Sequence, residues 1–277
     1  MRTAIIVILL LVPPITAVAQ STTITITNSA CTNPPPPGDV AAPVTPSIAA
    51  GTAAARNRNF ALARANFLPL AEKGDPDGQR AMGQLLMQDC TGLQDKKAAV
   101  GWLIKAAAMG NVAAEDQLGR AYMAGFGVAQ DDSRAFSFFN QAAATSDPVA
   151  EMEMGYLYLT GRGVAQDRYQ GLQWTVKAAE QGNAVALGNI AQAYNRGLVL
   201  ERDTERAAYF LALANQRATT VQRNELMNIA QEIRQAVSIE DLERASKHAQ
   251  RWTPGPGSLR DVMSDADDFR RHNHQDK

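Results

Sequence analysis

MGYLYLTGRGVAQDRYQGLQWTVKAAEQG, residues 154–182, is the stretch that decides the fold. Apolar residues recur at helical spacing on both sides of Gly161-Arg162-Gly163. Glycine accepts the left-handed conformation with which many helices end, and Asp167 suits the N-cap of a following helix because its carboxylate accepts amide hydrogen bonds. Gly182 ends the second helical pattern. The stretch therefore predicts two helices joined by a glycine turn.

The same pattern recurs along the chain with a period of 36 residues. The positions that hold this register are Asp95, Asp131, Asp167 and Asp203; Gly83, Gly119, Gly155 and Ala191; Leu86, Tyr122, Tyr158 and Tyr194; and Trp102, Phe138, Trp174 and Phe210. Periods of this length are typical of solenoids, in which each unit buries its apolar face against its neighbours. We therefore predict an all-α, right-handed α-solenoid of helix-turn-helix repeats with disordered N- and C-terminal tails.

These motifs resemble the Sel-1-like repeat, a relative of the tetratricopeptide repeat with a longer loop between its helices. The residues that carry the resemblance are Met154–Tyr158, Gly161–Asp167 and Trp174–Gly182, and, one unit earlier, Leu118-Gly119, Tyr122, Gly125–Val128 and Asp131. Two units depart from the motif. Asp89-Cys90-Thr91 replaces the glycine turn of the first unit, and Gly197-Leu198-Val199 lacks the second glycine in the fourth. The chain looks like an exported bacterial member of this family.

The segment boundaries follow from the register and from composition. We predict a signal peptide at 1–19, a proline-rich disordered leader at 20–52, a repeat array at 53–218, C-terminal capping helices at 219–252 and a disordered tail at 253–277. Within the array we expect an N-terminal half-repeat at 55–74 and four units at 75–110, 111–146, 147–182 and 183–218. Thr253–Gly257 breaks the last helix because proline and glycine alternate there.

The first residues predict export. Arg2 precedes the apolar run Ala4–Val12, and Ala17-Val18-Ala19 is a cleavage motif, so the mature chain is expected to begin at Gln20 in the periplasm or outside the cell. The apolar run is too short to span a bilayer, which needs roughly 20 residues. An oxidising compartment favours a disulfide between Cys31 and Cys90; the alternative is two free thiols.

No motif in the sequence points to catalysis, a metal or a cofactor. His248, His272 and His274 lack the spacing of a zinc site. Gly125-Phe126-Gly127 lacks the third glycine and the preceding strand of a dinucleotide fingerprint. A formal net charge of −1 argues against nucleic acid as a partner. We therefore expect a non-enzymatic protein without cofactors, nucleic acid or a membrane span.

The resemblance implies that the first helices line a concave groove for a protein or peptide segment. Carrying the family's groove positions over by register gives Asp77, Arg80, Gln84 and Met87; Asp116, Arg120 and Met123; Met152, Tyr156 and Leu159; and Gln192, Asn195 and Arg196. For the methionines and Leu159, packing in the core is the alternative.

The resemblance also implies a scaffold or regulator in the cell envelope. One alternative is a hydrolase acting on cell walls or β-lactams, as in some cysteine-rich exported members. Those carry a cysteine pair in each repeat, whereas Cys90 is the single cysteine of this repeat region. No nucleophile–base pair can be named either. A purely structural spacer is the third interpretation.

Overall fold

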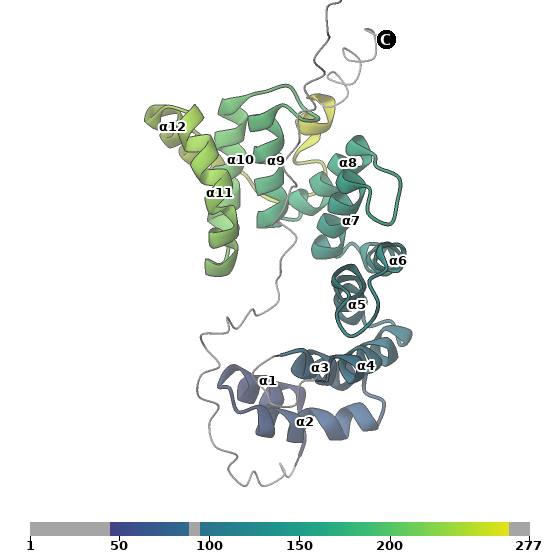
Figure 1. Ribbon diagram of the computed structural model, residues 1–277. Helices are drawn as coiled ribbons and strands as arrows, with labels where there is room; N and C mark the ends of the chain where they lie inside the picture. The colour runs from purple at the N-terminus through teal and green to yellow at the C-terminus, as the bar shows by residue number, and fades with distance from the viewer. Residues whose placement is uncertain (1–44, 89–94, 266–277) are drawn as a thin grey trace, which may run out of the picture.

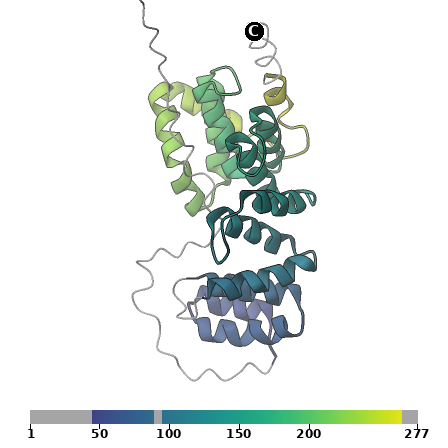
Figure 2. The same cartoon turned by 45° about the vertical axis from the view of Figure 1, so that its right-hand side comes forward.

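In the computed structural model, which describes residues 45–88 and 95–265, the chain is a row of packed helices (Figure 1). The helices are α1 Ile48–Arg56, α2 Phe60–Glu72, α3 Pro76–Met87, α4 Lys96–Ala108, α5 Val112–Ala124, α6 Asp132–Ala143, α7 Pro148–Thr160, α8 Arg168–Glu180, α9 Ala184–Arg196, α10 Thr204–Arg217, α11 Thr220–Ala236 and α12 Ile239–Ala249. Each helix packs on its neighbours in the chain from α1 to α11, and the row bends as it rises (Figures 1 and 2). The predicted all-α solenoid is confirmed.

The 36-residue register fixes where both helices of each unit begin. The predicted caps of the second helices, Asp95, Asp131, Asp167 and Asp203, each accept a hydrogen bond from a backbone N–H in the first turn. A second series does the same for the first helices: Asp75, Asn111, Asp147 and Asn183. Because the first backbone N–H groups of a helix lack intrahelical partners, these side chains stabilise the starts of the eight helices from α3 to α10.

Small residues let the two helices of one unit approach closely. A Cβ atom on Gly83 or Gly119 would come within 2.7 Å of a side chain on the following helix, Leu103 or Phe139. Glycine is therefore required at the crossing, where the larger side chain fills the space.

The second glycine of the turn joins neighbouring units. Gly163 has φ 70°, and a Cβ atom there would overlap the carbonyl oxygen of Asp132 at the start of α6. Gly127 lies in the same way against the carbonyl of Lys96, one unit earlier. The glycine turn thus ends the first helix and also lets the loop rest on the backbone of the preceding unit.

The array begins earlier than the sequence predicted. The leader was expected to extend to residue 52, but α1 starts at Ile48, with Ser47 as its N-cap. Gly51 and Ala54 are buried on α1, and Gly51 lies against the ring of Phe67 on α2. The predicted half-repeat is therefore a helix pair, because the small residues of this alanine-rich stretch allow close packing.

The predicted disordered tail is also wrong for its first part. Leu259 and Val262 are buried in the hydrophobic cluster that α8–α12 share. The Gly255 N–H donates to the Glu180 carbonyl at 2.7 Å, and the Tyr194 hydroxyl donates to Asp265 at 2.6 Å. Residues 253–265 therefore fold back over the end of the array, because apolar side chains at helical spacing are set among polar ones.

Candidate functional site

The predicted groove residues lie on the first helices α3, α5, α7 and α9, and we call this set of side chains the first-helix face. Most of them are half-buried, so they are open to solvent on one side. Two of the methionines predicted to line the groove differ in how deeply they are buried. Met123 is half-buried, whereas Met152 is buried in the cluster shared with α8 and α9. The structure therefore removes Met152 from the groove, because its unbranched side chain fills the core instead.

The centre of the face holds an ion-pair cluster. Arg120 Nε donates to Asp116 at 3.1 Å, one helical turn away on α5. Arg120 Nη2 also lies 2.8 Å from Oε1 of Glu153 on α7. Glu153 is fully buried, and Asp116 and Arg120 are 17% and 16% exposed. One guanidinium thus joins two neighbouring repeats through two carboxylates.

Burial shapes the titration of both carboxylates. Loss of solvation raises the pKa of Glu153 to about 7, which the attraction of Arg120 only partly offsets and the negative charge of Asp116 adds to. Burial likewise raises the pKa of Asp116 above its ordinary value. The cluster therefore changes charge near neutral pH.

Sequence reasoning missed Glu153. A signal was available in the register, since the equivalent positions are Ala81, Gln117 and Asn189. Polar side chains in the last three units mark a position that is not simply apolar core. The partner Arg120 was named, but the contact depends on how α5 and α7 pack.

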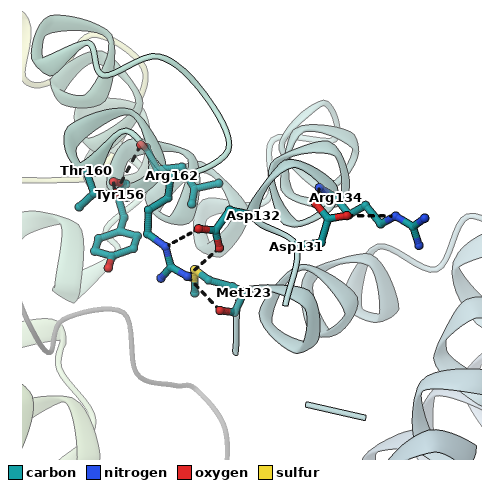
Figure 3. Close-up of polar contacts among 8 residues, drawn as sticks. Met123, Asp131, Asp132, Arg134, Tyr156, Thr160 and Arg162 are labelled. Carbon is teal, nitrogen blue, oxygen red and sulfur yellow. Dashed lines mark hydrogen bonds and ion pairs between the residues drawn. The ribbon is translucent and has the colours of Figure 1, made fainter. Parts of the chain in front are cut away.

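A second link between units lies beside Met123 and Tyr156 (Figure 3). Arg162 Nε donates to Asp132 at 3.0 Å, and its Nη2 donates to the other carboxylate oxygen at 2.7 Å and to the Met123 carbonyl at 2.9 Å. A bidentate arginine–carboxylate pair fixes geometry as well as charge. The link holds the loop after α7 against α6, and so supports the wall on which Met123 and Tyr156 lie.

The C-terminal end of the face is partly occupied by the chain itself. Arg196 on α9 forms two hydrogen bonds to Glu232 on α11, at 3.2 and 2.7 Å. Gly188 lies against Leu226 of the same helix. Gln192 and Asn195 stay half-buried beside this contact, and Leu159 of the third unit packs against Gly171 on α8. Arg196 is therefore a contact with the capping helix.

The N-terminal end of the face opens into a pocket of about 360 Å³ between α1 and α3. Arg80 and Gln84, both predicted, line it, together with Arg56, Arg58 and Phe67. Met87 lies beyond the pocket, half-buried where two apolar clusters meet. The structure thus brings Arg80 and Gln84 together with residues of α1, a helix that the sequence did not predict. The predicted disulfide pair, Cys31 and Cys90, lies outside the described residues.

Two other kinds of site are a membrane-spanning helix and a metal centre. Within residues 45–88 and 95–265, no helix is both long and apolar enough to cross a bilayer. In the same ranges, no three metal-ligating side chains come together.

Comparison with known proteins gives the same repeat register. The Sel1 repeat matches residues 76–111, 112–145, 148–183 and 184–217. Among solved structures, a Sel1 repeat protein from Oxalobacter formigenes is similar to 82% of this chain and 100% of its own, with a TM-score of 0.57 and 22% identity. A protective antigen of uropathogenic Escherichia coli, c5321, which displays an SLR fold, covers 69% of this chain and 44% of its own, with a TM-score of 0.48 and 25% identity. A search of curated protein sequences finds no match. Because the four matches span half of the chain, it belongs to the Sel1 repeat family.

Proposed function

We propose that this chain is an exported scaffold that binds a segment of another protein along its first-helix face, in the cell envelope. Sel1 repeat proteins generally mediate protein–protein interactions, and scaffolds of this family are typically non-catalytic. The observation that carries the proposal is the row of half-buried polar and aromatic side chains on successive first helices, from Arg80 and Gln84 to Tyr156 and Gln192. Such side chains anchor partners when they lie side by side on a rigid array.

Site-specific photocrosslinking tests the face directly. A photoreactive residue is placed at Met123, Tyr156 or Gln192 in the full chain, and crosslinked products are recovered from the native envelope. A matched control uses Lys105, Gln141 and Lys177, exposed positions that are 36 residues apart on the second helices. We expect a common partner from the first-helix positions and none from the second-helix positions. Equal products from both sets, or none from the first, would contradict the proposal.

Export has its own test. Intact-mass measurement of the protein recovered from the periplasm or medium should give a chain that begins at Gln20. Retention of residues 1–19 with recovery from the cytoplasm alone would refute the location without bearing on the face.

A further inference from the structure

The pocket between α1 and α3 is unusually basic. Its lining includes three arginines from three different segments: Arg56 at the end of α1, Arg58 in the following turn and Arg80 on the second turn of α3. Among residues 45–88 and 95–265, no acidic side chain lines it. Buried Phe67 and Leu85 supply an apolar part of the wall. The pocket therefore joins concentrated positive charge to an apolar surface.

Among the described residues, only one of these three arginines, Arg80, has an ion pair. Arg80 lies 3.7 Å from the exposed carboxylate of Asp77 and donates to the uncharged Gln84 at 3.2 Å. Arg56 and Arg58 have no ion pair among the described residues. The Nη2 atom of Arg58 is shielded from solvent and has no hydrogen-bond acceptor among the described residues. The Arg58 side chain as a whole is half-buried, and a turn of its guanidinium toward the pocket would give this N–H an acceptor from outside the chain.

The backbone beneath Arg58 is also unusual. Its φ is 61°, in the left-handed region that disfavours residues other than glycine. At the ends of α5 and α7 the left-handed residues are Gly125 and Gly161. The first turn of the array keeps an arginine where glycine would fit with less strain. Ser146, after α6, has a similar φ of 60° outside this pocket, so the conformation of Arg58 supports a site only together with its place in the pocket lining.

In each later unit, the residue equivalent to Arg80 is paired, buried or covered by another helix. In the 36-residue register, Arg80 corresponds to Asp116, Met152 and Gly188. Asp116 is paired with Arg120, Met152 is buried in the core, and Gly188 lies against Leu226. The open cationic site is therefore a property of the N-terminal end of the face, where α1 and α3 meet.

We propose that the α1–α3 pocket binds a carboxylate of an acidic peptide segment, with a neighbouring apolar side chain of that segment against Phe67 and Leu85. Guanidinium groups match carboxylates in paired, charge-assisted hydrogen bonds. The C-terminal end of α1, which the pocket adjoins, disfavours any anion, and it disfavours the doubly charged phosphate more than the singly charged carboxylate. This inference rests on the proposed function, since the segment is part of the partner on the first-helix face.

Binding of two short fluorescent peptides by the full-length chain tests the inference. One peptide alternates glutamate with leucine, and the other alternates glutamine with leucine. We expect wild type to bind the glutamate peptide preferentially, and Arg58→Gln and Arg80→Gln each to weaken that binding roughly ten- to hundredfold, the size expected for a charged hydrogen bond. The control is Arg64→Gln, an exposed arginine on α2 outside the pocket, which should bind like wild type. Circular dichroism verifies that each variant is folded.

Four results would overturn the inference. They are equal binding of both peptides, an equal loss in Arg64→Gln, displacement of the peptide by inorganic phosphate at matched ionic strength, and a gain of more than tenfold in Asp89→Asn. The last would assign the pocket to the chain's own Asp89, which follows the lining residue Gln88 in sequence. Photocrosslinking from Met123 and Tyr156 separates the two proposals. A partner that is still captured there while the glutamate peptide fails to bind leaves the scaffold intact and removes only the acidic specificity.

Discussion

Arg120 and Glu153 form an ion pair between neighbouring repeats, with 2.8 Å between the guanidinium and a carboxylate that is entirely buried. Asp116 accepts a hydrogen bond from the same guanidinium. One positive charge therefore faces two negative charges when both acids are ionised. Desolvation of a buried carboxylate can exceed the attraction of its partner, so the cluster fixes the position of two helices at a cost that depends on pH.

The raised pKa of Glu153 predicts how the energetic cost of this cluster varies with pH. The folded-state pKa is about 7, above the ordinary value of 4.5, so the folded chain holds a proton that the unfolded chain releases. The contribution of protonated Glu153 to the free energy of unfolding is complete below about pH 4.5 and is lost as pH rises through about 7. Glu153→Gln removes this dependence and should be more stable than wild type by about 1–3 kcal/mol at pH 8, but not at pH 4.5. Urea unfolding of both proteins across this range measures it; parallel curves would refute the prediction.

The link between Arg162 and Asp132 should stabilise the junction of two units. Both side chains are less than a third exposed, and the pair is bidentate. A double-mutant cycle with Arg162→Ala and Asp132→Asn should give a coupling energy of about 1–2 kcal/mol.

The control for this cycle is the more exposed pair of Arg134 and Asp131 within one helix start (Figure 3). Asp131→Asn keeps a capping side chain, so the cycle isolates the charge, and its coupling should stay below about 0.5 kcal/mol. Equal coupling in the two cycles would mean that the bidentate geometry contributes nothing.

The two glycines of one turn should differ in their tolerance of alanine. Gly161 has φ 71°, and the nearest atom to an added Cβ is 3.1 Å away on the Gln166 side chain. Gly161→Ala should therefore cost about 1 kcal/mol from the backbone conformation alone. Gly163→Ala adds an overlap with the Asp132 backbone and should cost about 2–4 kcal/mol. Thermal unfolding of the two variants decides the order, and a larger loss in Gly161→Ala would contradict it.

The returning segment should stabilise the C-terminal end of the array. Leu259 and Val262 are buried there, so Leu259→Ala with Val262→Ala should lower the unfolding free energy by about 3–5 kcal/mol. Arg260→Ala, between them in sequence and exposed, is the control and should leave stability unchanged. Differential scanning calorimetry compares the variants. An unchanged midpoint in the double variant would show that this packing is not needed.

The sequence alone determined the repeat, because helix starts and turns depend on nearby residues. Asp131 caps the helix that follows it, and Gly161 ends the helix that precedes it, so both roles follow from spacing. The same local logic located the first helices and placed Arg80, Arg120 and Tyr156 on them.

Only the tertiary structure decided which of these residues are free to contact a partner and which are occupied by the chain itself. Glu153 meets Arg120 across two units, Glu232 occupies Arg196, and Asp265 reaches Tyr194 from 71 positions away. Arg58 and Arg80 share a pocket because α1 folds onto α3. The 36-residue period specifies contacts that every unit repeats. The contacts of Glu153, Glu232, Asp265 and Arg58 are not repeated from unit to unit. They depend on how neighbouring units pack and on the two ends of the row, where the periodic pattern stops.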